Sequence, residues 1–142
     1  TANVIVILSD DRISSPYLRV FDTAIILNQQ SMDKFEKEIR PGGVLIYDPN
    51  GITHHPTRTD IAIYQIEGTK IAAEMGNKKI FNMVILGGYL NIKPIVKLDN
   101  VVEGLKKSLS ERYHNLIPLN VEAIKKGMES VLHYEVTTQM LH

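Results

Sequence analysis

The sequence predicts an α/β fold, a three-layer domain in which a mostly parallel sheet is flanked by helices, with a helical C-terminal third. Two patterns support this prediction. In the first half, short apolar runs without polar alternation read as strands covered on both faces, and an amphipathic segment separates two of them. After Gly68 the apolar residues recur at helical spacing. Strands and helices that alternate in this order are typical of α/β domains.

Composition narrows the class of protein. The chain has 142 residues, 44% hydrophobic and 23% charged, which is enough for one hydrophobic core, and a single domain over residues 1–142 is expected. The 16 basic and 16 acidic residues cancel, so no basic field favours nucleic acid. The apolar runs fall well short of the ~20 residues that cross a membrane. Because no signal peptide opens the chain, a cytoplasmic location is expected.

Four apolar runs are predicted to be strands. The first, Val4–Leu8, is apolar throughout and is read as a buried strand. The third, Val44–Tyr47, follows Arg40–Gly43, whose Pro and Gly residues are typical of a turn. The four predicted strands cover residues 4–8, 23–27, 44–47 and 60–66.

Helices are predicted between the second and third strands and after the fourth. The first covers residues 31–39, with Ser31 as its N-cap. The next, 69–75, ends at Gly76–Asn77, a pair that favours a left-handed stop. The segment 80–90 is nearly all apolar and contains Gly87, so it is expected to be a buried helix packed closely against another element. Two amphipathic helices are expected at residues 101–109 and 121–132, followed by a tail or partner contact over 134–142.

One set of residues suggests phosphoryl transfer. Asp10 and Asp11 follow the first predicted strand, Asp48 follows the third, and Thr69 and Lys93 come later. Carboxyl ends of parallel strands meet at one edge of a sheet, and such a set resembles the site of a phosphoryl-accepting receiver domain. The segment 12–22 is too short for a receiver's first helix, and the 48 residues after 94 exceed what a receiver needs. The alternative is that the three carboxylates are turn residues at strand ends.

The histidine residues are not spaced in a pattern that predicts a catalytic or metal centre, and the chain lacks cysteine. His54 and His55 are adjacent, so in a strand they would point in opposite directions, and a solvated loop is expected there instead. His114, His133 and His142 are expected to be surface residues. The chain has no Cys, so it has no thiolate for a disulfide or an iron–sulfur cluster. Common nucleophile and phosphate-binding motifs are also absent.

Four stretches together resemble a known family. They are the opening Ala2–Asp10 with its Ser-Asp ending, Phe21–Gln30 (FDTAIILNQQ), Ile39–Asp48 (IRPGGVLIYD) and Thr69–Gly87 (TKIAAEMGNKKIFNMVILG). This order is similar to the gamma subunit of 2-oxoacid:ferredoxin oxidoreductases, which also occurs as a domain of single-chain pyruvate:ferredoxin oxidoreductase. Members of that family usually begin with a strand, a Gly-x-Gly-Gly-Gln-Gly turn and a helix. The resemblance therefore implies an N-terminally truncated gamma-type domain, whose strand at Val4–Leu8 would have lost a neighbour.

The resemblance implies a function for the complex and a division of labour within it. The complex would oxidatively decarboxylate a 2-oxoacid, with 2-oxoglutarate favoured over branched 2-oxoacids and pyruvate, in the presence of coenzyme A and ferredoxin. Thiamine diphosphate with Mg²⁺ and the iron–sulfur clusters would be held by alpha and beta subunits, and by a ferredoxin-like delta subunit where one exists. This chain would supply no catalytic residue and would help to frame coenzyme A.

The best-marked family stretch gives four candidate positions, Gly76, Asn77, Asn82 and Gly87, with no assigned coenzyme contact and no metal ligand. Asn82 would bind a backbone group or a partner chain, or else be a buried side chain satisfied within its own subunit. Gly87 would allow close helix packing. Besides the receiver-like site, a non-catalytic nucleotide-binding module of similar topology remains an alternative.

Overall fold

The computed structural model describes residues 2–15 and 18–137. Its sheet has the order β1-β2-β3-β4. Strands β1 (Phe21–Ile26), β2 (Ile39–Tyr47) and β3 (Ala62–Gln65) are parallel, and the short β4 (Leu132–Tyr134) pairs antiparallel with β3. The sheet is therefore mostly parallel, as the sequence predicts.

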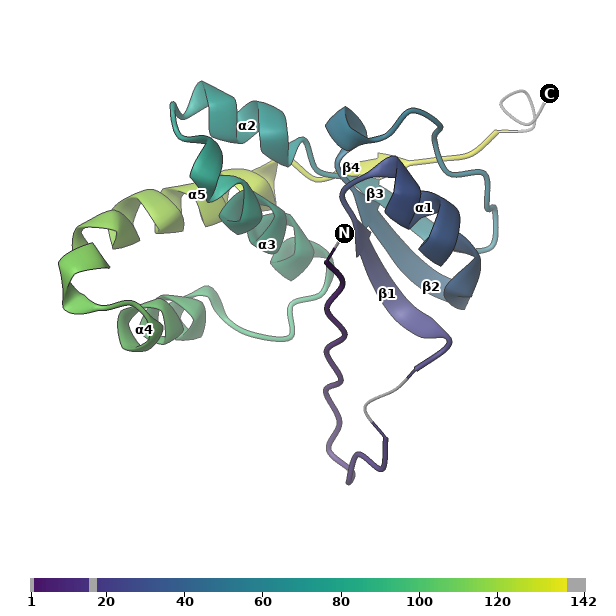
Figure 1. Cartoon of the computed structure of the whole chain (residues 1–142), viewed down its shortest axis with the longest axis horizontal. Helices are drawn as coiled ribbons and strands as arrows, with labels where there is room; N and C mark the ends of the chain where they lie inside the picture. The colour runs from purple at the N-terminus through teal and green to yellow at the C-terminus, as the bar shows by residue number, and fades with distance from the viewer. Residues whose placement is uncertain (1, 16–17, 138–142) are drawn as a thin grey trace.

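Helices cover both faces of the sheet (Figure 1). Helix α1 (Gln29–Phe35) and the 3-10 turn η1 (Glu36–Glu38) connect β1 to β2, and η2 (Pro49–Gly51) follows β2. After β3 come α2 (Gly68–Glu74), η3 (Lys78–Ile80), α3 (Phe81–Ile92), α4 (Leu98–Ser108), η4 (Glu111–Leu116) and α5 (Ile117–Glu129). The three-layer architecture and the helical C-terminal part are confirmed.

Strand β2 supplies side chains to both halves of the core, because successive residues of a strand point to opposite faces. Val44 and Ile46 belong to the cluster that includes Ile66 and Val84 under the C-terminal helices. Leu45 and Tyr47 belong to the cluster that includes Met32 of α1. Burial on both faces explains why this run has no polar alternation.

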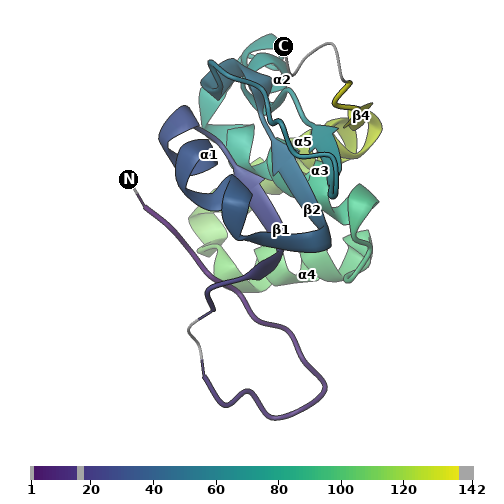
Figure 2. The same ribbon diagram turned by 90° about the vertical axis from the view of Figure 1, so that its right-hand side faces the viewer.

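The run Val4–Leu8, predicted to be a strand, is not one. It lies in an extended N-terminal arm (residues 2–15), which begins level with the sheet and runs down below it in both views (Figures 1 and 2). Val4 is 85% exposed and Leu8 is 70% exposed. A strand requires a neighbour for its backbone N–H and C=O groups. In the described residues β1 pairs with β2 alone, and the arm pairs with no strand of the sheet.

Local capping also differs from the prediction at two places. The N-cap of α1 is Asn28, whose side chain accepts a hydrogen bond from the backbone N–H of Ser31 (2.8 Å). Arg40–Gly43 is not a turn between elements but an irregular part of β2, where the register with β1 shifts and Gly42 has a φ of +79°. At Gly76 the φ of +75° ends α2, as the sequence predicts.

The C-terminal tail also contains structure. Residues 132–134 form β4 instead of ending the last predicted helix or remaining a tail, and residues 138–142 of the predicted tail lie outside the described residues. Within the described ranges, no helix is both long and apolar enough to cross a bilayer.

Helices α3 and α5 pack backbone against backbone. A Cβ on Gly87 would overlap the carbonyl oxygen of Ile124, and a Cβ on Gly127 would overlap that of Val84. A Cβ on Gly88 would meet the side chain of Ile66. The close packing expected for Gly87 is present, with α5 as the partner helix.

This packing predicts opposite effects for two glycine-to-alanine changes. Gly87→Ala should destabilise the domain by about 1–3 kcal/mol or more, because the added methyl overlaps a main-chain oxygen that cannot move alone. Gly104→Ala in α4 should stabilise it by up to about 1 kcal/mol, since a Cβ there meets no atom within 4 Å. Urea unfolding of both variants tests this pair; equal free energies of unfolding would contradict it.

Candidate functional site

Ligands of α/β sheets bind at the carboxyl ends of the parallel strands. Asp48 directly follows β2 and is buried, with 1% of its surface exposed. One carboxylate oxygen accepts hydrogen bonds from the backbone N–H (2.9 Å) and the hydroxyl (2.7 Å) of Thr69, and the other accepts from the N–H of Asn50 (3.0 Å). Asp48 thus joins the end of β2 to the start of α2.

The structure brings together only part of the receiver-like set. Asp48 and Thr69 are in contact, but Asp10 and Asp11 lie on the exposed N-terminal arm, where the N–H of Asp11 is bonded to the hydroxyl of Ser9 (3.0 Å). Lys93 caps the C-terminal end of α3 through its backbone. Within the described residues no three His, Asp or Glu side chains are placed to hold a metal ion. The hydrogen bonds from Asn50 and Thr69 occupy both carboxylate oxygens of Asp48, and a carboxylate in a turn at the end of a strand is expected to be used in this way.

The histidine loop after β2 is exposed, as the sequence predicts, but the roles of its two rings differ. His54 lies beside Thr53, with 3.2 Å between ring Nδ1 and the hydroxyl oxygen. His55 Nδ1 lies 2.9 Å from the hydroxyl of Tyr47, and its ring stacks on Tyr134. The sequence carries no periodic signal for this contact, because the three residues come from different elements.

The other histidines also differ in burial. His114, predicted to be a surface residue, is half-buried, and its Nε2 donates to the carbonyl oxygen of Leu109 (2.9 Å). The ring closes the turn between α4 and η4, a structural role that the sequence does not indicate. His133 is exposed on β4, and His142 lies outside the described residues.

The four family-stretch positions lie along the segment from α2 to α3. Gly76 forms the turn, and the side chain of Asn77 accepts a hydrogen bond from the N–H of Lys79 (3.0 Å). Asn82 is exposed at the start of α3, so the reading of Asn82 as a buried, internally satisfied side chain is wrong. Gly87 contacts α5. The geometry explains Gly76, Asn77 and Gly87 as structural residues, and any ligand or partner contact by the four positions stays a prediction.

The loop between β2 and β3 is attached to the domain by two side chains of the α1–η1 segment. Gln29 Oε1 accepts hydrogen bonds from the N–H groups of Thr53 (2.9 Å) and His54 (2.8 Å). Glu36 accepts from the N–H of Thr57 (2.9 Å). Acceptors on one short helical segment therefore determine the path of the loop.

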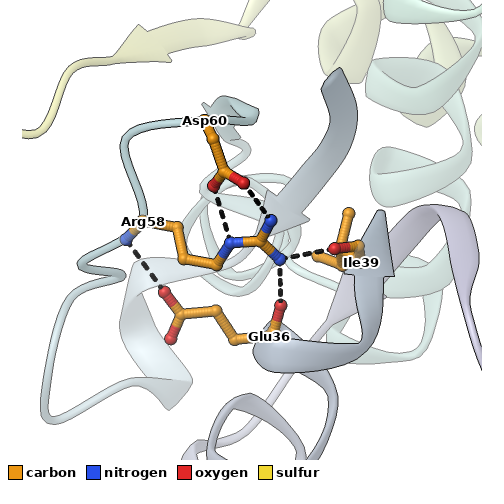
Figure 3. A network of polar contacts seen from close by, with 4 residues as sticks. All are labelled: Glu36, Ile39, Arg58 and Asp60. Carbon is orange, nitrogen blue, oxygen red and sulfur yellow. Dashed lines mark hydrogen bonds and ion pairs between the residues drawn. The ribbon is translucent and has the colours of Figure 1, made fainter. Parts of the chain in front are cut away.

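Arg58 forms the densest polar network of this loop (Figure 3). Its side chain is 19% exposed and makes a bidentate pair with Asp60 (2.7 and 2.6 Å). It also donates to the carbonyl oxygens of Glu36 (3.0 Å) and Ile39, at the end of η1 and the start of β2. The hydrogen bonds from Arg58 lower the pKa of Asp60 below its ordinary value.

Tyr47 is the buried titratable group at this end of the sheet. Its hydroxyl also accepts a hydrogen bond from Gln65 Nε2 (2.6 Å). Burial raises the pKa of Tyr47 to about 12, against the opposing effect of the Gln65 hydrogen bond. A phenol that remains neutral in this way is suited to hydrogen bonding rather than to base catalysis at neutral pH.

The Arg58 network should contribute measurably to stability. Arg58→Lys keeps the charge but loses the planar set of donors, and should lower the free energy of unfolding by about 1–3 kcal/mol. The control is Arg40→Lys, because Arg40 and Asp22 form an exposed pair (61% and 69% exposed) and such pairs contribute little. The difference in free energy of unfolding between wild type and Asp60→Asn should shrink as the pH falls below the ordinary carboxyl range. The reason is that Arg58 lowers the pKa of Asp60 by stabilising its ionised form, so this contribution is lost when Asp60 is protonated. A pH-independent difference would contradict this account.

Tyr47 should make the domain sensitive to alkali. Because its pKa is raised in the folded state, its contribution to stability is complete below about pH 10 and is lost as the pH rises toward 12. Tyr47→Phe loses the hydrogen bonds of the hydroxyl and should be less stable than wild type near neutral pH. Because it has no phenol to ionise, its free energy of unfolding, measured with urea, should fall less steeply in alkali. Tyr113→Phe, at a site 41% exposed, should decline like wild type. Equal slopes for all three proteins would contradict the prediction.

The chain is similar to a known protein family and to several of its characterised members. Residues 1–130 match the model of the family described as pyruvate ferredoxin/flavodoxin oxidoreductase. The 2-oxoglutarate synthase subunit KorC of Methanocaldococcus jannaschii is 30% identical over 131 residues, which cover 87% of this chain and 66% of KorC. The ketoisovalerate oxidoreductase subunit VorA of Methanothermobacter thermautotrophicus is 25% identical, over 91% of this chain and 27% of VorA. The chain thus spans less than two thirds of the length of these curated relatives.

Solved structures agree with this assignment. The gamma subunit of keto/oxoacid ferredoxin oxidoreductase from Geobacter sulfurreducens has the same fold, with a TM-score of 0.66 at 22% identity over 77% of this chain and 63% of that one. The 2-oxoglutarate:ferredoxin oxidoreductase from Magnetococcus marinus has a TM-score of 0.69 at 25% identity, over 78% of this chain and 19% of that one. On the match over residues 1–130, and with this fold, the chain belongs to the pyruvate ferredoxin/flavodoxin oxidoreductase family.

Proposed function

We propose that this chain is a gamma-type subunit of a complex that oxidatively decarboxylates a 2-oxoacid. In that reaction the 2-oxoacid loses CO₂, its acyl group passes to the thiol of coenzyme A, and two electrons pass to ferredoxin. The observation that carries the proposal is the family match over residues 1–130. The similarity to subunits of 2-oxoglutarate synthase and ketoisovalerate oxidoreductase, and to a pyruvate-flavodoxin oxidoreductase, supports a 2-oxoacid as the substrate class.

We favour 2-oxoglutarate as the substrate. KorC is named as a subunit of 2-oxoglutarate synthase, and the Magnetococcus marinus enzyme is described with 2-oxoglutarate, coenzyme A and succinyl-CoA bound. Both are similar to this chain over more than three quarters of its length. The preference rests on these relatives and not on a pocket residue of this chain.

The residues of this chain do not fit the redox cofactors of such a complex. It has no Cys, so it has no thiolate for an iron–sulfur cluster. The described residues contain no set of three His, Asp or Glu side chains suited to a Mg²⁺ ion. We therefore assign thiamine diphosphate with Mg²⁺ and the iron–sulfur clusters to alpha and beta subunits, or to a ferredoxin-like delta subunit, and no step of the chemistry to this chain.

The N-terminal arm is the surface of this chain best suited to contact other subunits. Val4, Val6 and Leu8 lie at alternate positions and are 70–85% exposed, so in extended backbone they point to the same side. Exposed apolar surface of this kind marks interaction sites in soluble proteins. We therefore expect the partner subunits of a gamma-type chain to contact this arm.

The natural protein that contains this chain, tagged and expressed with the proteins encoded beside it, tests the proposal. Co-purification of thiamine- and cluster-binding subunits, with reduction of a viologen dye that requires both a 2-oxoacid and coenzyme A, would support it. The rates with 2-oxoglutarate, pyruvate and a branched 2-oxoacid would identify the substrate. A chain that purifies without partners and without 2-oxoacid-dependent activity would contradict the function.

A charge in the arm should prevent assembly without unfolding the domain. Val6→Asp should reduce the co-purified partner subunits at least several-fold, because a carboxylate is costly to bury in an apolar interface. The unfolding midpoint of the 142-residue chain should not change with this substitution, since Val6 is 73% exposed in it. Ser110→Asp adds the same charge at an exposed residue outside the arm and should assemble normally. Wild-type recovery of partners with Val6→Asp would show that the arm is not the contact.

A further inference from the structure

The C-terminal strand β4 is short and depends on contacts beyond its ladder with β3. Only three residue pairs form that ladder. The ring of Tyr134 also stacks on His55, with 5.3 Å between centroids and 20° between planes, and meets the edge of Tyr47 at 6.0 Å. A loop histidine and a core tyrosine therefore help to hold β4 on the sheet.

The hydrogen bonds of Tyr47 define the protonation state of His55. Tyr47 is fully buried, so its hydroxyl hydrogen needs an acceptor within the protein. The Gln65 amide nitrogen donates to the hydroxyl oxygen and cannot accept (2.6 Å). The hydroxyl must then donate to His55 Nδ1, 2.9 Å away. This arrangement requires a neutral imidazole with its hydrogen on Nε2.

Protonation of His55 removes that acceptor. Both ring nitrogens then carry hydrogens, so turning the ring does not restore an acceptor for Tyr47. The buried hydroxyl hydrogen is left without a partner beside the contact that holds Tyr134. The attraction between a protonated His55 ring and the ring of Tyr134 would offset part of this cost in free energy. The cost of leaving a buried hydroxyl without an acceptor is larger than that gain.

We propose that the contact of His55 with Tyr47 and Tyr134 is a pH-sensitive latch, which holds β4 to the sheet when His55 is neutral and weakens that hold when His55 is protonated. Histidine is the side chain whose charge changes most readily near neutral pH, so the hold should be weaker in acid than in mild alkali. Release of β4 would uncover the outer edge of β3.

Other charged groups near the latch are paired. On the same loop, Arg58 is bound to Asp60, and Glu36 of η1 accepts from loop N–H groups. On β4, His133 lies 3.7 Å from Glu135. Its ring also packs against Tyr64 of β3, with 5.3 Å between centroids, so a change at His133 acts on the β3–β4 pair directly.

Hydrogen exchange of the β3 and β4 backbone amides at pH 8 and pH 5, corrected for intrinsic rates, tests the latch. The protection of residues 132–134 should fall roughly tenfold or more at pH 5 relative to the amides of α3 and α5. His55→Gln should remove this pH dependence, because an amide oxygen accepts from Tyr47 at both pH values. His54→Gln is the matched control on the same loop and should keep it.

Two outcomes would overturn the proposal. Equal protection at both pH values in wild type would mean that the Gln65 amide turns and accepts from Tyr47 when His55 is protonated. Persistent pH dependence in His55→Gln would assign the effect to another group. If His55→Gln does not fold, the ¹⁵N shifts of the wild-type His55 ring decide the matter: a hydrogen on Nε2 at pH 8 supports the latch, and one on Nδ1 contradicts it.

Discussion

The contact between α3 and α5 is the constraint on which the rest of the domain depends. Gly87 lies against the main chain of Ile124, and Gly127 lies against that of Val84, so the two backbones meet without side chains between them. Such an approach is possible only where both helices present glycine. It makes the two helices one layer, and that layer covers the face of β2 that carries Val44 and Ile46. Gly88 allows the same layer to lie close to Ile66 after β3.

Polar side chains then determine the paths of the connections. Asp48 binds the first residues of α2, Gln29 and Glu36 bind the loop between β2 and β3, and Arg58 ties that loop to the carbonyl oxygens of η1 and β2. In many α/β proteins the carboxyl ends of the strands carry the active site. Here the polar groups at that edge are largely used by the backbone of the domain itself.

The apolar surface of the molecule is distributed unevenly. Much of the exposed apolar surface lies in residues 4–27, before and along β1, whereas β2 is buried on both faces. The core of the domain is satisfied, whereas Val4, Val6 and Leu8 are displayed to solvent.

The sequence by itself determined the elements whose signal is local. Continuous apolar runs indicated β1, β2 and β3, helical spacing indicated α3, α4 and α5, and Gly76 indicated the end of α2. The resemblance to the family rested on residues along the chain and needed no geometry. These signals are visible because burial and backbone conformation constrain residue type directly.

Tertiary structure decided what depends on distant partners. Val4–Leu8 has the composition of a strand, but a strand exists only where a neighbour accepts and donates its hydrogen bonds. Asn82 lies in an apolar run and yet faces solvent, because α3 buries its other sides. Asp48 joins β2 to α2 because Thr69 folds against it, and His55 meets Tyr47 and Tyr134 because a loop, β2 and β4 converge. Contacts between distant residues leave no local pattern, so only the folded chain reveals them.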